Sequence, residues 1–476
     1  MSTASPSSAA STASPGPRGS GAVRTAERMR RPGRLRLLER GSGAVAVSRS
    51  LAVLALVALV GLLPWLSSND PALTILRATS AEREATPEVL DAIRERLGLD
   101  AGPVGSIRHW LSGLIHGDPG VSWISGDSVG PGTLDAFGVS LVLMGASLAV
   151  ALVTAALLIL PTLVDGLTGR RRSRGGALAA ALTSLPEYLL APVLLLILSV
   201  YLGWLPPYGW GGPERIVLPA LSLGLPGGGL LGGLLSDAVA AVFAERWVTT
   251  WTTAGIGGRG LALAVLRRAL TPLTGQVALV VVGLTGGAVA VEKVFAIPGI
   301  GRALLGSATA QDVPALQAGV LLLLVLALGA GALAVLASRA LVGRAAGAGG
   351  LAPAPPVERT GDGARVVAVL GAVGLVGLVL AGIGRDPYAV VGRRLEAPSW
   401  ALPLGADALG RDVLARVAHG AVATAVSALV VTVVCAVIGL LLGLAPRASV
   451  GPVEVANAAP PVLAGLIVAA VTGPSA

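Results

Sequence analysis

Long apolar runs alternate with polar intervals along this chain. A bilayer core about 30 Å thick requires about 20 apolar residues of helix, and the runs meet that length. They occupy residues 45–66, 139–164, 178–203, 215–241, 270–292 and 316–341, then 365–383, 420–445 and 455–472. The pattern predicts an all-α, polytopic membrane protein with six spans in its first part and about three in its second.

The polar intervals divide the chain into regions. Residues 1–40 are rich in Ser, Ala and Pro and then in Arg, which predicts a disordered basic tail. Residues 41–343 form the first unit, in which 67–138 is a long extracytoplasmic segment. Residues 344–363 are rich in Gly, Ala and Pro and predict a linker before a partial second unit, 364–476. The run 45–66 is long for a signal peptide and lacks a clear cleavage site, so we interpret it as the first span.

Composition agrees with a membrane protein. Only 13% of the residues are charged, against about 25% in soluble domains, and the mean hydropathy is +0.79. The net charge of +9 comes from arginines at the ends of apolar runs, as the positive-inside bias requires. This bias places the N-terminus and residues 243–273 in the cytoplasm. With 3% aromatic residues and no basic domain, the chain is not expected to bind nucleic acid.

The sequence lacks the residue patterns that several kinds of functional site require. Lys293 is the single lysine, and Val294 follows it where a phosphate-binding P-loop has Ser or Thr. The three histidines lie far apart, which predicts no metal site, and Cys435 has no cysteine to pair with. We therefore expect no catalytic residues, metal or cofactor in this chain.

Charged residues inside the apolar runs are candidates for function, because they are costly in lipid. Glu187 and Asp237 are such residues, and we take them as candidates for lining a translocation path. Interfacial placement is the alternative for both. Glu292 and Lys293 are interpreted as an interfacial pair at the outer end of a span. The many glycines, such as those at 227–229, predict close helix packing.

The first 343 residues resemble the permease subunits of dipeptide, oligopeptide and nickel ABC importers. Three stretches carry the resemblance: ERLGLD with WLSGLIHGDPG, LGWLPPYGW with VLPALSLGLP, and VEKVFAIPGIGRALLGSATAQDVPALQ. The last is similar to an outer-side family motif, matched here by Glu292, Phe295, Pro298, Gly299 and Gly301. The resemblance implies a six-helix, type I importer bundle.

Residues 243–273 resemble the family's coupling loop, which docks into an ATPase. The matching positions include Val248, Thr250, Ala254, Gly255, Ile256, Arg259 and Arg268. A short helix, a glycine that permits a tight turn, and a second helix form a rigid lever. Thr249, Thr252 and Ala254 stand where the family usually has basic residues, which predicts weaker docking electrostatics. The alternative is an ordinary cytoplasmic loop without a partner.

Residues 403–416, PLGADALGRDVLAR, are similar to a motif of the sibling permease in the same importers. Gly405, Asp407, Gly410, Arg411 and Asp412 match, whereas Ala406 and Ala415 depart from it. The chain therefore resembles two sibling permeases fused in series, the second truncated.

The resemblance implies a multi-pass subunit in the cytoplasmic membrane of a bacterium. Its expected partners are two ABC ATPases, which bind ATP and Mg²⁺, an extracytoplasmic solute-binding protein, and a further permease chain or remainder. Peptide, nickel chelate and opine importers share these motifs, so the solute stays open. A degenerate scaffold and an ion-coupled secondary transporter are the alternative functions.

Overall fold

A computed structural model of the protein describes residues 47, 50–51, 53–66, 72–73, 75–76, 85–96, 102–170, 176–342, 362–444 and 453. The predicted basic tail, the linker up to residue 361 and the run 455–472 lie outside the described residues. Within them, five helices are long and apolar enough to cross a membrane, or six if one bent pair counts as a span. The predicted all-α, polytopic class is confirmed.

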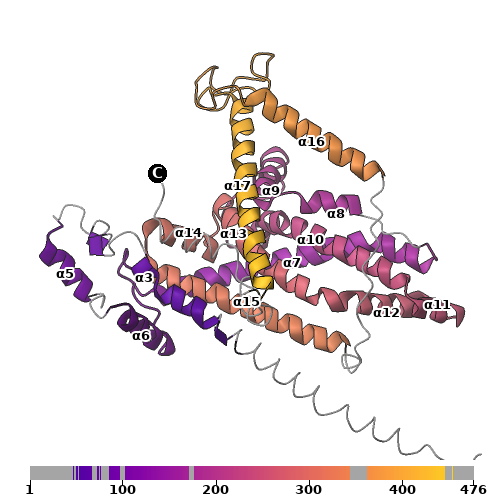
Figure 1. Ribbon diagram of the computed structural model, residues 1–476, viewed down its shortest axis with the longest axis horizontal. Coiled ribbons are helices and arrows are strands. Elements are labelled where there is room, and N and C mark those ends of the chain that lie inside the picture. The colour runs from indigo at the N-terminus through magenta and orange to yellow at the C-terminus, as the bar shows by residue number, and fades with distance from the viewer. Residues whose placement is uncertain are drawn as a thin grey trace, which may run out of the picture.

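The first unit is a bundle of long helices (Figure 1). Its elements are α3 (Leu63–Leu66), α5 (Pro87–Arg96), α6 (Gly102–Ile115), α7 (Val129–Leu167), α8 (Gly176–Thr183), α9 (Glu187–Leu194), the π-helix η2 (Leu195–Tyr201), α10 (Pro213–Phe243), α11 (Arg246–Thr253), α12 (Gly258–Leu270), the 3-10 helix η3 (Thr271–Leu273), α13 (Thr274–Val294), α14 (Ile300–Ala310) and α15 (Val313–Val342). With 39 residues, α7 is about 58 Å long at 1.5 Å per residue, so it extends beyond an apolar core of about 30 Å.

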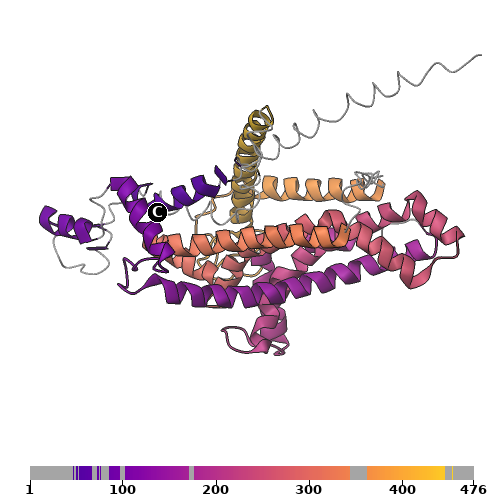
Figure 2. The same ribbon diagram turned by 90° about the horizontal axis from the view of Figure 1, so that it is seen from below.

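The two ends of the bundle carry different elements. Figures 1 and 2 both place α6 and α14 at one end, and α11 and α12 at the other. At the α14 end, Asp312 accepts hydrogen bonds from Ser122 Oγ at 2.5 Å and from the amide of Trp123 at 3.1 Å. Gln317 Nε2 donates to the Val60 carbonyl at 2.9 Å. The start of α15 therefore holds both the end of the first apolar run and the segment after α6.

A glycine ridge brings α10 against α7, the most extensive helix contact of the bundle. Gly224, Gly228 and Gly232 follow one another at intervals of four and share one helix face. A Cβ at Gly224 would lie 2.6 Å from the Ser147 carbonyl oxygen, and one at Gly228 would lie 2.8 Å from that of Ala151. Close packing by the glycines of α10 is thus confirmed, because these positions admit no side chain.

Gly228→Val should separate α7 from α10. The added carbons would meet Thr154 Cβ and the Ala151 backbone, none of which a rotamer change can move aside, so we expect a loss of stability on the order of 3 kcal/mol. Gly283→Val on α13 is the matched control, since nothing lies within 4 Å of a Cβ there. Thermal unfolding of both variants in detergent measures the difference. Equal losses would contradict the close α7–α10 contact.

The prediction of one continuous helix over 178–203 is wrong. The segment consists of α8 and of α9 with η2, bent by 90° at a short break. Pro186 ends the break, immediately before α9. Proline donates no backbone hydrogen bond and disfavours helical conformation in the residue before it, which accounts for the bend. The run is therefore a broken span or a re-entrant loop.

The second unit contains α16 (Asp362–Gly382) and α17 (Val413–Gly443), which pack against each other. A Cβ at Gly382 would lie 2.6 Å from the Leu414 carbonyl oxygen, so the two helices meet closely near the chain segment that joins them. Farther along, the most apolar stretch of α17 is 0% buried by the described residues. The described residues therefore leave the long apolar surface of this helix uncovered.

Candidate functional site

The α11–α12 hairpin, residues 243–273, turns at a glycine. Gly255 has φ +78°, a left-handed conformation that glycine adopts without strain. The Gly255 amide donates to the Thr252 carbonyl at 3.1 Å, and the Ile256 amide donates to the Trp251 carbonyl at 2.9 Å. This pair of bonds is the Schellman arrangement that ends a helix. The turn predicted at Gly255 is thus present.

An ion pair joins the two ends of the α11–α12 hairpin. The Glu245 carboxylate, at the N-cap of α11, lies 3.2 Å from Arg268 Nε near the end of α12. Trp247 Nε1 also donates to Glu245, at 2.6 Å. Arg267 Nε donates to the Leu341 carbonyl at 2.9 Å, in the last turn of α15, where a cation also suits the helix dipole. The sequence analysis missed Glu245, because its side chain makes no N-cap hydrogen bond and its partner Arg268 lies 23 positions away.

An apolar cluster fixes the hairpin to the bundle. Val248 is 6% exposed and packs with residues from the end of α10 and from α12. The other buried members are Val239, Val242, Phe243, Leu261, Val265 and Ala269. The Phe243 ring lies directly over Gly166 of α7, where a Cβ would overlap it. Packed side chains therefore join the hairpin to α10 and α7.

The tip of the hairpin faces outward. Every residue from 249 to 260 is exposed, including the motif positions Thr250, Ala254, Gly255, Ile256 and Arg259. Trp251 and Ile256 are 37% and 44% exposed, and the Trp251 ring packs edge-to-face on Trp247 with centroids 5.2 Å apart. The predicted coupling residues thus divide into two anchors, Val248 and Arg268, and an exposed tip.

Glu292 lies in the last turn of α13 and is 0% exposed. Ser140 Oγ of α7 donates to its carboxylate at 2.5 Å, and the Arg302 amide donates at 2.8 Å. Ser140 in turn accepts the Ile300 amide at 2.8 Å. The carboxylate therefore satisfies the N-terminal amides of α14, which also carry the positive end of the helix dipole.

Glu292 is buried whereas the neighbouring Lys293 is exposed, so the two do not form a surface pair; the placement of both at the membrane interface stays a prediction. The α13–α14 turn folds the carboxylate back onto α7 and away from solvent. The other motif residues shape this turn: Phe295 is 2% exposed, and Gly299 is the N-cap of α14. A Cβ at Gly299 would overlap the Glu292 carboxylate, which explains a glycine there, while Pro298 is exposed.

Comparisons with known proteins identify this architecture. The family model described as "Binding-protein-dependent transport system inner membrane component" matches residues 170–346, which contain the α11–α12 hairpin and the Glu292 turn. The metal-staphylopine import system permease protein CntB of Staphylococcus aureus (strain NCTC 8325 / PS 47) is 30% identical over 266 residues, covering 56% of this chain and 85% of that protein. The chain belongs to this family of inner membrane permeases.

Other relatives give the same result. The glutathione transport system permease protein GsiC of Salmonella typhimurium is 31% identical over 274 residues, which cover 57% of this chain and 87% of that protein. GsiC of Escherichia coli (strain K12) is 30% identical over 268 residues, covering 56% and 85%. The protein is thus an ABC importer permease, a multi-pass protein of the bacterial inner membrane and not an enzyme.

Two charged residues of the permease were candidates for a translocation path. Glu187 is half-buried in the first turn of α9, and its Cδ would lie 3.3 Å from a Cβ at Gly287 of α13. Asp237 is exposed and lines a cavity of about 420 Å³ between α8 and α10. Glu187 is not among the described residues that line this cavity. The structure therefore does not bring the two carboxylates to one site.

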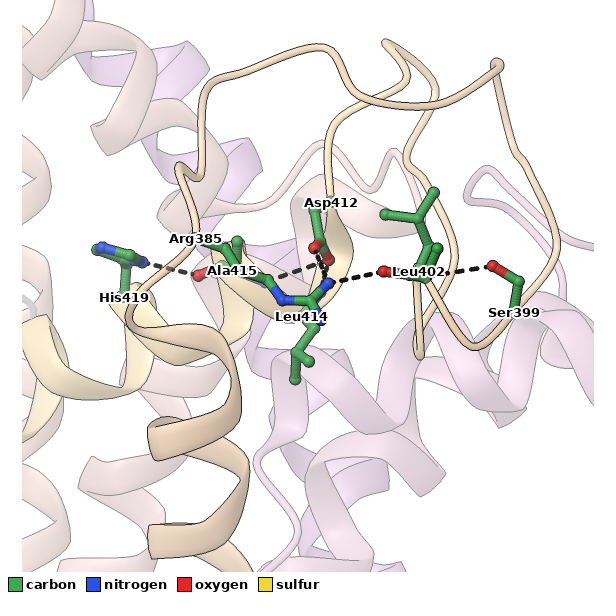
Figure 3. Close-up of polar contacts among 8 residues, drawn as sticks. Arg385, Ser399, Leu402, Asp412, Leu414, Ala415 and His419 are labelled. Carbon is green, nitrogen blue, oxygen red and sulfur yellow. Dashed lines mark hydrogen bonds and ion pairs between the residues drawn. The ribbon is translucent and has the colours of Figure 1, made fainter.

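The second-unit motif of the permease forms a folded cap over the start of α17 (Figure 3). Asp412 is the N-cap of α17 and accepts the amides of Leu414 at 2.8 Å and Ala415 at 3.3 Å. Arg385 Nη1 binds the same carboxylate at 2.8 Å. Burial alone would raise the pKa of Asp412, but the Arg385 hydrogen bond and the two amides hold this pKa below its ordinary value.

Asp407 organises the rest of the cap. The Arg411 amide bonds its carboxylate at 3.0 Å, and the side chains of Arg411 and Arg416 bond it at 2.9 Å and 2.5 Å. The hydrogen bond from the Arg411 amide is the main cause that lowers the pKa of Asp407 well below its usual range, and the two arginine side chains add to it. Gly405 and Gly410 have φ +73° and +79°, and a Cβ at either would overlap a backbone carbonyl oxygen. The five motif residues thus form one compact turn.

Proposed function

We propose that this permease passes peptides or similar small solutes from an extracytoplasmic binding protein across the cytoplasmic membrane, driven by two partner ATPases. The observation that carries the proposal is the α11–α12 hairpin, whose base is fixed and whose tip is exposed. Its motif positions at the tip are exposed, while Glu245–Arg268 and the Val248 cluster secure its base.

The hairpin has the properties of a mechanical link. A partner that moves the tip moves a rigid body, because the ion pair closes its base and Arg267 ties it to α15. The exposed side chains of Trp251 and Ile256 give the tip an apolar surface, which a groove on an ATPase would bury. Closure of the two ATPases would then rock the helices and open the path alternately to each side.

We assign each loop to one side of the membrane from the positive charges that it carries. In this proposal the N-terminus and the hairpin are cytoplasmic, and the segment 67–138 with the Glu292 turn faces outward, where the binding protein delivers the solute. The relatives are named for the import of metal-staphylopine and the transport of glutathione. These names support small organic molecules as the class of solute. Glu187 and Asp237 remain the proposed polar positions along the path.

The second unit is the other part of the chain for which we propose a role. We infer a fusion of two sibling permeases, in which α16 and α17 belong to the second. A further permease chain or remainder would cover the exposed surface of α17 and supply the second ATPase contact. ATP and Mg²⁺ would be bound by the ATPases, and this chain would hold no cofactor.

A non-transporting scaffold is the second candidate function, because the tip carries Thr249 and Thr252 where the family usually has basic residues. An ion-coupled transporter ranks lower, since Glu187 and Asp237 have no counterparts in residues 365–472.

Reconstitution tests the proposal. The permease, its ATPases and the binding protein are placed in proteoliposomes, and ATP hydrolysis is measured with and without solute-loaded binding protein. We expect loaded binding protein to stimulate hydrolysis and to drive solute uptake. Unchanged hydrolysis would support the scaffold, and uptake driven by an ion gradient without ATP would support the secondary transporter.

A further inference from the structure

A groove of about 530 Å³ runs between α13 and α15. Leu279 and Val335 line it and are exposed, so the groove opens to the surroundings of the bundle. Its polar lining residues, Thr274, Ser338 and Arg339, lie at the start of α13 and near the end of α15. Every other described residue of the lining is Gly, Ala, Val or Leu. The groove therefore has one polar end and an apolar remainder, as a lipid has.

The groove has about the length of one bilayer leaflet. Along α15 its lining extends from Ala327 to Arg339, which is about 18 Å at 1.5 Å per residue. One leaflet contributes about 15 Å to an apolar core about 30 Å thick. The polar end lies beside the α11–α12 hairpin, because Arg267 of α12 binds the Leu341 carbonyl at the end of α15 (Figure 1). The groove thus spans the leaflet on the hairpin side.

Glycines on both helices make room in the groove. Nothing lies within 4 Å of a Cβ at Gly275 of α13 or at Gly331 of α15. These glycines differ from Gly228 of α10, where a Cβ would meet the backbone of α7. An unfilled groove would cost its walls the dispersion contacts that close packing supplies. An extended acyl chain has the length and the width to supply them.

The polar end carries a positive charge without a counter-charge. Arg339 is exposed and forms no ion pair or hydrogen bond with the residues that the structure describes. Ser338 is only partly buried, and its hydroxyl also has no partner among them. No carboxylate belongs to the described lining, and Arg267 adds a second guanidinium nearby. An arginine fork matches the oxygens of a phosphate, and basic pockets between helices suit anionic headgroups.

We propose that this groove binds an anionic phospholipid of the inner leaflet, with one acyl chain between α13 and α15 and the phosphate on Arg339 and Ser338. The choice of leaflet rests on the cytoplasmic side proposed for the hairpin. Binding itself requires no ATPase, binding protein or transported solute. The headgroup lies at the end of α15 to which Arg267 ties the hairpin, so the lipid contacts the support of the hairpin base.

Native mass spectrometry of the purified full chain in detergent tests the headgroup contact. The probes are phosphatidylglycerol, an anion, and phosphatidylcholine, a zwitterion, with the same acyl chains. We expect about fivefold tighter binding of phosphatidylglycerol and loss of this preference in Arg339→Gln, since one basic residue near anionic lipid contributes about that factor. Arg246→Gln is the matched control, because it removes an exposed arginine at the same end of the bundle but outside the lining.

A second pair of variants tests the acyl chain. Gly331→Leu places a side chain in the groove and should weaken binding of both lipids by a similar factor. Gly329→Leu on the same helix should not, because a Cβ there is also free of contacts but Gly329 lies outside the lining. Thermal unfolding of these two variants without lipid should be the same, which separates a filled groove from a damaged fold. Glycerol phosphate, which lacks acyl chains, should displace neither lipid.

Four results would overturn the proposal. They are equal binding of the two lipids by the native chain, an equal loss of preference in Arg246→Gln and Arg339→Gln, equal lipid binding by Gly331→Leu and Gly329→Leu, and displacement by glycerol phosphate, which indicates a site for a free anion. Release of the lipid when a further permease chain is added would also overturn it, because protein would then cover the groove. Since no ATP is hydrolysed in these measurements, their failure leaves the transport proposal standing.

Discussion

Gly255→Pro should abolish the stimulation of ATP hydrolysis by loaded binding protein while leaving the permease in the membrane. Proline fixes φ near −65°, whereas Gly255 has φ +78° and donates its amide to Thr252. The substitution therefore breaks the Schellman turn and re-aims the tip of the α11–α12 hairpin, at a cost on the order of 1–3 kcal/mol confined to this turn. Hydrolysis in the reconstituted complex measures the effect.

Gly169→Pro is the matched control. Gly169 follows α7 with φ +83°, donates its amide to the Gly166 carbonyl, and has nothing within 4 Å of a Cβ. The control therefore also replaces a glycine of positive φ just after a helix by proline, but at a helix end outside the hairpin. We expect stimulation to survive in this variant. Stimulation that persists in Gly255→Pro would show that the hairpin is not the coupling element.

Glu292→Ala should destabilise the permease by about 3 kcal/mol, because it leaves the buried Ser140 Oγ and the partly buried Arg302 amide without their acceptor. The N-terminus of α14 also loses the negative charge that opposes its dipole. Thermal or denaturant unfolding in detergent measures the loss.

Two further variants sharpen this prediction. Glu292→Gln keeps one acceptor oxygen and should lose about half as much stability, since hydrogen bonds to neutral groups are roughly half as strong. Lys293→Ala changes the neighbouring exposed residue and should have little effect. If Glu292→Ala is as stable as Lys293→Ala, the carboxylate does not hold the α13–α14 turn.

Local patterns in the sequence predict much of this fold. The apolar runs correspond to α7, α10, α13, α15, α16 and α17, because hydropathy and length alone decide which segments suit a bilayer. The glycine turn at Gly255 and the compact turn around Asp407 also follow from short-range conformational preferences. Glycine packing on α10 was predictable because small residues allow close approach in lipid.

Contacts between distant segments could not be predicted in this way. Glu292 is buried because Ser140, 152 positions away, lies beside it in the fold. The Glu245–Arg268 pair likewise depends on the hairpin bringing two helix ends together. The break at Pro186 was a local signal, but the apolar character of the whole run outweighed it.

Cysteine labelling tests the central claim, that the bundle presents the hairpin to ATPases on the cytoplasmic side. The native Cys435 is replaced by Ser, and Ile256→Cys or Ser125→Cys is introduced at an exposed position of each end. A membrane-impermeant maleimide should label Ser125→Cys in intact spheroplasts and Ile256→Cys only in inverted vesicles, and bound ATPases should protect the latter. Labelling of both from the same side, or no protection by the ATPases, would contradict the account.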